Sequence, residues 1–555
     1  MVAWWAALTA AHGKRGPVRL DAEPDALRAP FEPDRAIRMQ PALRALARRI
    51  GSSLGVLDAE VAAYQAGLAY TGMLSPAHRA EHGVYYTPPA LGARLIDRAT
   101  AAGVDWRTAR VLDPACGGGA FVAPVARRIA GALGSCEPHV VLEHVAQRVR
   151  GYEIDPFAAW LSQVALDAVM LPVTRACGRR LPNAVRVCDT LRGAPPAEPF
   201  DLVIGNPPYG RVRLDASERK RFERSLFGHA NAYGLFTDAA IALTKPGGVI
   251  AYVTPASFLG GEYFKNLRSL LGREAPPASI DFVSARGGVF DGVLQETLLA
   301  TYRRGASAGP VVISTLQPVD ETALAVEAIG LASLPPEASS PWIVPRHRDH
   351  MRLAAALATM PHRLADWGYT ISTGPLVWNR YKDQLAHRPA RNRYPVIWAE
   401  AVAPGGAFVW RAEKRNHAPY CEIRPRDAWM VVRRACVLLQ RTTAKEQARR
   451  LIAAPLPVDF IERHGAVVVE NHLNMIRPAV TRPAVSHAVV SAFLNSAAAD
   501  RAFRCVSGSV AVSAYELEAL PLPPPDELEP LRRLIASHAP PATIEAACED
   551  LFRGR

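Results

Sequence analysis

The stretch FDLVIGNPPYG, residues 200–210, has the pattern of a buried strand that ends abruptly. A mainly apolar run, typical of a buried strand, leads into Asn206, two prolines and a tyrosine. Proline cannot continue a central strand, and it pushes the residue before it into an extended conformation. We therefore predict that a strand stops at Asn206 and holds this side chain at its carboxyl end, where open α/β sheets bind ligands. A Pro-Pro pair alone would indicate only a tight turn, so the neighbouring segments must decide between these interpretations.

The segments around this stretch alternate between strand-like and helix-like patterns. Short apolar runs such as ARVLD (109–113), VRGYEID (149–155) and GGVIAYVTP (247–255) are separated by segments with apolar residues at helical spacing. Such alternation predicts an α/β fold with a mostly parallel sheet and helices on both faces.

Changes in composition divide the rest of the chain. Helical spacing dominates the start, Gly, Ser and Pro mark connectors, and prolines precede a helical end. We expect a helical N-terminal region at 1–80, the α/β domain at 81–310, a linker at 311–341, a mixed, basic region at 342–520 and a helical tail at 521–555.

The bulk composition is that of a folded protein. Of 555 residues, 49% are hydrophobic and 21% are charged, which is ordinary for globular proteins. We expect no apolar stretch long enough to span a bilayer. The start, MVAWWAALTAAHGKRG, lacks a charged segment before its apolar part, so we expect a buried helix there rather than a signal peptide. Eight cysteines without a C-x-x-C pair argue against a zinc site or a disulfide framework and fit a reducing cytoplasm.

The positive charge is concentrated in one segment. The chain carries a formal net charge of +13, and residues 341–460 contain 20 Lys or Arg against 9 Asp or Glu. A basic segment of this kind fits a polyanionic partner such as nucleic acid, although a basic surface can also serve solubility alone.

A glycine-rich turn and three acids mark the ends of successive strands. VLDPACGGGAF (111–121) is a short strand, an acid and a turn that opens into a helix. Without the full G-x-G-x-x-G fingerprint, this loop suits a nucleoside with a small charged tail. Glu153 is placed to bind the two hydroxyls of a ribose, and Asp189 to accept from the amino group of an adenine ring. One acid at a strand end is more often a helix cap. Three acids at the ends of consecutive strands, followed by Asn-Pro-Pro-Tyr at the fourth, are a far more specific signal of a ligand-binding site.

These motifs together resemble those of the amino-methylating DNA methyltransferases that use S-adenosylmethionine, specifically the gamma-ordered adenine methylases of type II restriction–modification systems. The resemblance covers about residues 80–305, from GVYYTPPALGARLI (83–96) to GGVFDGVLQETLLATY (287–302). It implies a Rossmann-like class I methyltransferase core with a helical N-terminal extension and a mixed α+β target-recognition domain. The cofactor-binding residues that it implies are Thr87, Asp113, Ala115, Gly117, Glu153, Asp189 and Asn206.

The resemblance also implies a catalytic set for a flipped adenine: Asn206, Pro207, Tyr209 and Phe290. The lone pair of the adenine amino group is delocalised into the ring, so acceptors aimed at its hydrogens would free that lone pair. The Asn206 side-chain oxygen and the Pro207 carbonyl are the expected acceptors. Tyr209 and Phe290 are expected to hold the base after it leaves the duplex. Asn at the first position favours adenine, because cytosine amino-methylases usually carry Ser there.

The expected partner is double-stranded DNA. Basic and aromatic residues are interleaved in residues 377–398, as contacts to phosphates and bases require. The candidate DNA-binding residues are Arg380, Lys382, Arg391, Arg393 and Arg441. The resemblance further implies protection of host DNA from a separately encoded restriction endonuclease, a cytoplasmic monomer without a membrane or a metal, and S-adenosylmethionine as methyl donor.

One spacing departs from the expected pattern. About forty residues separate Asp113 from Glu153, roughly twice what a single crossover helix needs. We expect SCEPHVVLEHVAQR (135–148) to form an extra helix or loop.

Three other functions remain open from the sequence. Methyltransferases that act on a protein glutamine amide or on guanine amino groups of ribosomal RNA share Asn-Pro-Pro-Tyr, but usually lack a large basic C-terminal domain. A bifunctional restriction enzyme would need a nuclease domain, for which the first 80 residues are short. A DNA-binding module with an inactive methylase core is the non-enzymatic alternative, and it would bind the cofactor without transferring a methyl group.

Overall fold

The computed structural model describes residues 1–11, 41–75, 86–193, 196–284, 296–442, 449–507 and 511–553. The chain forms two compact units. Unit 1 contains residues 1–258 and 263–334, and unit 2 contains residues 259–262 and 335–555. The finer five-part division expected from the sequence stays a prediction.

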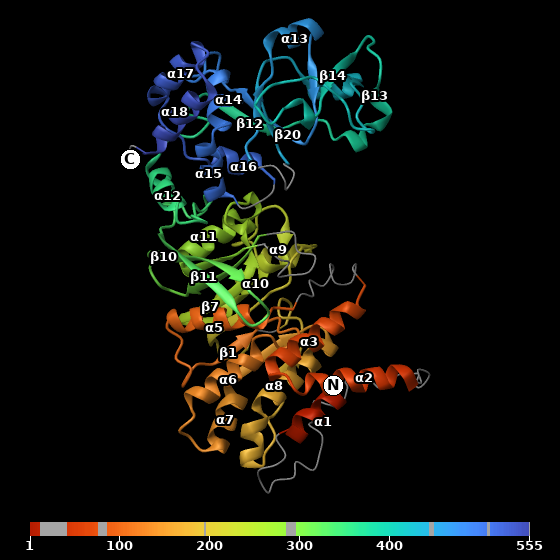
Figure 1. Ribbon diagram of the computed structural model, residues 1–555, viewed down its shortest axis with the longest axis vertical. Coiled ribbons are helices and arrows are strands. Elements are labelled where there is room, and N and C mark those ends of the chain that lie inside the picture. Colours follow the sequence, from red (N-terminus) through yellow and green to blue (C-terminus); the bar gives the residue numbers. More distant parts are fainter. Residues whose placement is uncertain are drawn as a thin grey trace. The chain divides into compact units, whose positions relative to one another are not determined.

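Unit 1 is the α/β part of the molecule (Figure 1). Its helices are α1 (Val2–Ala11), α2 (Pro41–Leu54), α3 (Ala59–Met73), α5 (Pro89–Ala101), α6 (Val122–Ala132), α7 (Pro138–Arg148), α8 (Pro156–Cys177), α9 (Ala216–Arg221), α10 (Ala232–Leu243) and α11 (Lys265–Glu274). Its strands are β1 (Val111–Asp113), β2 (Val149–Glu153), β3 (Val185–Val187), β4 (Phe200–Gly205), β5 (Arg211–Val212), β6 (Ala230–Asn231), β7 (Thr244–Pro255), β8 (Pro277–Val283), β9 (Thr297–Arg303), β10 (Val311–Pro318) and β11 (Leu324–Ala332).

The main sheet of unit 1 is mostly parallel. Within the described residues it has nine strands in the order β11-β10-β8-β9-β7-β4-β1-β2-β3. Strands β3, β2, β1, β4 and β7 pair in parallel, whereas β9 runs antiparallel to both β7 and β8. After β1 the chain builds outward through β2 and β3, and it then returns to place β4 on the other side of β1. This reversal between β1 and β4 is the topological switch point at which such sheets bind ligands.

Helices cover the sheet because alternate strand residues face opposite sides. Val253 of β7 belongs to a core that also contains apolar side chains of α5, α6 and α7. Its neighbour Tyr252 is fully buried, and its hydroxyl donates to the Phe236 carbonyl of α10. The sheet is therefore covered on both faces, as its strand pattern predicts.

The extra segment between β1 and β2 forms a helix, as its unusual length predicts. α7 begins at Pro138, and its apolar side joins the core through Val141, Leu142 and Val145. The insertion adds a layer to the unit and leaves β1 and β2 paired in register, with Val111 opposite Val149.

The N-terminal helices pack onto α8. Trp4, Trp5 and Leu8 of α1 form one apolar cluster with Ala62 of α3 and with residues of α8, which confirms the expected buried helix. One expectation was wrong: α8, with 22 residues, is long and apolar enough to cross a membrane by length and composition. However, 67% of its apolar window is buried. α8 is a core helix of unit 1, and this explains its composition.

Unit 2 mixes helices and short strands around separate cores (Figure 1). Its helices are α12 (His350–Thr359), α13 (Val458–His464), α14 (His487–Leu494), α15 (Ala497–Val506), α16 (Ala514–Glu518), α17 (Glu529–Ala536) and α18 (Pro541–Arg553). Its strands are β12 (Tyr369–Thr373), β13 (Leu385–Ala386), β14 (Arg393–Ile397), β15 (Tyr420–Glu422), β16 (Val431–Val432), β17 (Val437–Gln440), β18 (Ala453–Pro455), β19 (Val467–Val469) and β20 (Leu473–Pro478). One sheet has the order β12-β20-β17-β18 and another the order β13-β15-β14-β19-β16.

Candidate active site

The sequence-predicted residues meet at the carboxyl edge of the main sheet. β1 ends at Asp113 and β2 at Glu153, while Asp189 and Asn206 follow β3 and β4. These four side chains line one cavity of about 400 Å³, a volume within the range of small-molecule sites. Thr87, Ala115, Gly117 and Tyr209 also line it.

Close packing between β1 and β4 fixes the centre of the site. A Cβ atom on Gly205 would lie 2.7 Å from Oδ1 of Asp113, a distance that real Cβ atoms do not tolerate. A side chain at position 205 would therefore displace the Asp113 carboxylate, and glycine lets this carboxylate lie against the backbone that leads into Asn206. No local pattern singles out Gly205, because this contact joins two strands that are distant in the chain.

Asp113 is a buried carboxyl group with one unsatisfied oxygen. Its Oδ1 accepts a hydrogen bond from the Ala115 amide at 3.1 Å. Its Oδ2 is buried, and it has no hydrogen-bond partner among the described residues. Burial raises the pKa of Asp113 well above its usual value, and the nearby Glu153 carboxylate raises it further. A buried carboxylate oxygen without a donor costs free energy, so the protonated form of Asp113 is favoured in the ligand-free protein.

Glu153 is oriented by the backbone around it. Its Oε2 accepts from the Gly117 amide at 2.8 Å, and its Oε1 accepts from the amides of Ile154 and Asp155 at 2.9 Å each. Burial raises the pKa of Glu153, and these three amides oppose that rise. The hydrogen bonds therefore hold the carboxylate in one orientation and tie the glycine loop to the end of β2.

Asp189 lines the same cavity from the turn that follows β3. Its Oδ1 accepts from the amides of Leu191 at 2.9 Å and Arg192 at 3.2 Å. Its Oδ2 is 3.4 Å from the Arg192 guanidinium. The next residue, Thr190, donates its hydroxyl to the Pro114 carbonyl. Asp189 thus caps its own turn, and the Thr190 contact links that turn to the glycine loop.

Asn206 is held between two side chains from different segments. Its Nδ2 donates to Oγ1 of Thr87 at 3.1 Å, and its Oδ1 accepts from the Tyr209 hydroxyl at 2.7 Å. The Tyr209 ring packs edge-on against Tyr233, with 6.1 Å between the ring centroids. These two hydrogen bonds therefore hold both the nitrogen and the oxygen of the Asn206 amide in place.

Of the other two predicted catalytic residues, the structure describes Pro207 but not Phe290. Pro207 is buried, and the cavity is lined by its neighbours Asn206, Pro208 and Tyr209. Phe290 lies outside the described residues. Tyr86 was not singled out from the sequence although it precedes Thr87, and it lines the cavity as a buried side chain.

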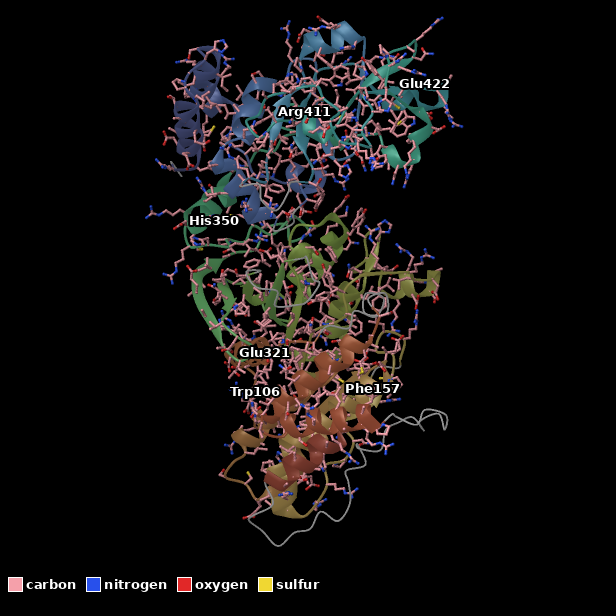
Figure 2. All side chains as sticks on the ribbon, turned by 45° about the vertical axis from the view of Figure 1, so that its right-hand side comes forward. Trp106, Phe157, Glu321, His350, Arg411 and Glu422 are labelled. Atoms are coloured by element: carbon pink, nitrogen blue, oxygen red, sulfur yellow. The ribbon has the colours of Figure 1, made fainter. Side chains whose placement is uncertain are left out.

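The predicted DNA-binding residues lie in unit 2, and they differ in their contacts. Arg380, Lys382 and Arg391 are exposed, and the Lys382 ammonium lies 5.3 Å from the centre of the Trp378 ring. Arg393 instead forms an ion pair with Glu422 at 2.9 Å, and Figure 2 shows Glu422 in the strand-rich part of this unit. Arg441 donates to the Asn471 carbonyl. The exposed cations are therefore better placed for phosphate contacts than Arg393.

Comparison with known proteins agrees with this geometry. Residues 193–290, which include Asn206, match the model of the Eco57I restriction-modification methylase family. The type II methyltransferase M.PstI of Providencia stuartii is 28% identical over 60% of this chain and 66% of its own length. M.BsuBI of Bacillus subtilis is 24% identical over 59% of this chain and 66% of its own length. The chain thus matches just under two thirds of the length of these homologues.

A solved structure supports the fold over most of the chain. The type IIL restriction-modification enzyme MmeI, in complex with DNA, superposes with a TM-score of 0.52 at 12% identity, and the match covers 88% of this chain and 77% of that one. With the strand order described above, this likeness confirms the predicted Rossmann-like class I methyltransferase fold.

Proposed function

We propose that this protein is a site-specific DNA methyltransferase that transfers a methyl group to the N6 amino group of adenine in duplex DNA. The observation that carries the proposal is the Asn206 amide. It is held at both ends at the switch point of the sheet, and it borders a cavity that Asp113 and Glu153 also line. Type II methyltransferase homologues and the family match around Asn206 support the same reaction class.

The cavity fits S-adenosylmethionine, which supplies an activated methyl group when it is bound. Its sulfonium and ammonium groups are cationic, and the unsatisfied Oδ2 of Asp113 offers such a ligand an acceptor in a buried setting. Glu153 would hold the ribose hydroxyls and Asp189 the adenine amino group, with Ala115 and Gly117 beside the amino-acid end. Unpaired buried carboxylates are costly, so cofactor binding should stabilise the fold.

The protein's own groups would act on the target base by accepting hydrogen bonds. Asn206 Oδ1 and the Pro207 carbonyl would accept the two amino hydrogens and free the nitrogen lone pair for attack in line with the methyl group. In the structure Oδ1 already accepts from Tyr209, but an amide oxygen has two lone pairs and can accept a second donor. The target atom is inaccessible in a duplex, so the base must be flipped, with Tyr209 and Phe290 as the flanking aromatic side chains.

The basic surface of unit 2 would bind duplex DNA and read the target sequence. Arg380, Lys382 and Arg391 would contact phosphates, because they are exposed and lie in the segment with the largest positive charge. Phosphate contacts position a protein on DNA, and base contacts give specificity. We infer a role in restriction–modification, as a cytoplasmic monomer that protects DNA from a separately encoded endonuclease.

The direct test is transfer of a labelled methyl group from S-adenosylmethionine to defined substrates. Plasmid DNA should be labelled in N6-methyladenine, whereas ribosomal RNA and a mixture of cellular proteins should not. Asn206→Ala is the matched variant, and it should reduce transfer by about 100-fold or more, as loss of an oriented catalytic group does. Labelling of RNA or protein instead of DNA would replace the proposed substrate, and cofactor binding without any transfer would indicate a DNA-binding module.

A further inference from the structure

The cavity that Asn206 borders is rich in carboxyl groups. The acids that line it are Asp113, Glu153, Asp155, Asp189 and Glu218. A nucleotide that leaves the duplex rotates about its backbone, so the phosphates on either side of it stay at the mouth of the pocket that takes the base. These phosphates would approach acidic side chains, and charges of the same sign repel. A cation beside the cavity would offset this repulsion.

Two arginines, Arg192 and Arg211, line the same cavity. Acids already occupy Arg192, since its guanidinium lies 2.7 Å from Glu218 and 3.4 Å from Asp189. Arg211 is exposed, and within the described residues it has no ion pair with an acid. A guanidinium is always charged, and its fork of N–H donors matches the oxygens of a phosphate. Arg211 therefore has its charge and its donors available for a phosphate.

The backbone around Arg211 holds this residue next to the catalytic motif. Gly210, which separates it from Tyr209, has a φ of +117°, a conformation that favours glycine. Beyond this turn, Arg211 of β5 pairs with Asn231 of β6, and the Ala232 amide donates to the Gly210 carbonyl at 2.9 Å. Two residues span at most about 7 Å, so the Cα atom of Arg211 lies within that distance of the Cα atom of Tyr209, the expected stacking partner of the base.

We propose that Arg211 binds a phosphate next to the flipped adenosine and holds the rotated nucleotide at the mouth of the cavity. This contact comes from unit 1 and adds to the phosphate contacts proposed for unit 2. The inference deepens the proposed function and rests on it, because it takes duplex DNA as the substrate.

The cofactor offers Arg211 a poorer ligand than DNA does. The sulfonium and ammonium groups of S-adenosylmethionine are cationic, so they repel a guanidinium. The cofactor carboxylate is the part of the molecule that would attract this side chain, and binding of S-adenosylhomocysteine, which carries the same carboxylate, tests for that contact. Arg211→Gln should bind S-adenosylhomocysteine with unchanged affinity by calorimetry.

The main test removes the phosphate charge and the arginine separately and together. Duplexes carry the sequence motif that the wild type methylates, and an uncharged methylphosphonate replaces the phosphate on the 5′ or the 3′ side of the target adenosine. For the wild type, one of these replacements should lower kcat/KM for DNA by about tenfold or more, the scale of a hydrogen bond to a charged group. Arg211→Gln should lower kcat/KM by a similar factor on unmodified DNA and lose nothing further on that methylphosphonate duplex.

Arg219→Gln is the matched control. Arg219 is exposed and lies between β5 and β6, as part of the same excursion of the chain, but its guanidinium donates to the Gly228 carbonyl at 3.0 Å. Arg219→Gln should therefore keep the full sensitivity to the methylphosphonate. A general loss of folding in Arg211→Gln would lower kcat/KM on every duplex and leave the methylphosphonate effect in place, so it is distinguished from loss of the contact.

Three results would overturn the phosphate contact. They are a wild type that is insensitive to both methylphosphonates, an Arg211→Gln variant that is as sensitive to them as the wild type, and weaker S-adenosylhomocysteine binding by Arg211→Gln, which would assign the side chain to the cofactor. A wild type that methylates RNA or protein but not DNA would overturn the proposed function itself, and this inference with it.

Discussion

The hydrogen bond from Asn206 to Thr87 makes the sharpest prediction about the active site. Thr87 is 3% exposed, and its Oγ1 accepts from Asn206 Nδ2 at 3.1 Å. This contact distinguishes the nitrogen end of the amide from the oxygen end. Thr87→Val keeps the shape and removes the acceptor, so the amide can rotate and present its nitrogen where its oxygen should be.

The size of the effect follows from the kind of bond. A hydrogen bond between neutral groups contributes about 0.5–1.5 kcal/mol net, which corresponds to a fall of about twofold to tenfold in the rate of methyl transfer. An amide hydrogen left unpaired also costs stability, about 1–3 kcal/mol. Thr87→Ser retains the hydroxyl and should keep most of the rate.

The assay is single-turnover methyl transfer at saturating cofactor and DNA, with cofactor affinity measured separately. A positioning role predicts a slower saturated rate in Thr87→Val and recovery in Thr87→Ser. If Thr87 acts only in cofactor binding, as the sequence resemblance implies, Val would weaken cofactor binding and leave the saturated rate unchanged. A wild-type saturated rate in Thr87→Val would show that Thr87 does not position Asn206 for methyl transfer.

Two further predictions concern stability and DNA binding. Asp113 has a raised pKa, so its contribution to the stability of the ligand-free protein is fully present below the usual carboxyl pKa of about 4 and is lost as pH rises through the raised value. Asp113→Asn should therefore melt higher than wild type at pH 8, with the difference shrinking toward pH 5, while its stabilisation by S-adenosylhomocysteine decreases; a lower melting temperature at pH 8 would contradict this. Arg391→Ala should reduce the slope of log affinity for DNA against log salt by about one unit, the contribution of one phosphate contact. Arg393→Ala should leave that slope unchanged because Arg393 is ion-paired, and an equal loss in both variants would show that the pair opens on DNA.

Local chemistry made much of the fold predictable. Prolines at 207 and 208 force β4 to end, and β4 does end at Gly205. The long spacing before Glu153 predicts an added element, which is α7. Acids at successive strand ends meet at one edge because parallel strands share their carboxyl ends. Each of these features follows from a few consecutive residues.

The contacts that the sequence could not give are long-range. Thr87 and Asn206 are 119 residues apart, and no pattern in either segment indicates their hydrogen bond. The ion pair of Arg393 with Glu422 could not be predicted for the same reason. Counting the Arg and Lys residues in a segment therefore gives too large a number of cations free to contact DNA. The composition of α8 is misleading in another way. Its apolar residues resemble a membrane-spanning helix, but they are apolar because most of the helix is buried within unit 1.

If Asn206 directs methylation of adenine in DNA, the modified bases in the DNA of a cell that expresses the protein should depend on this residue. The wild-type chain and Asn206→Ala are each expressed in a host without DNA methylation, and the host DNA is read by long-read sequencing. Wild type should place N6-methyladenine at one short sequence motif throughout the genome, and Asn206→Ala should leave that motif unmodified at equal protein level. Methylation of cytosine, or full adenine methylation by the variant, would contradict the proposed role of Asn206.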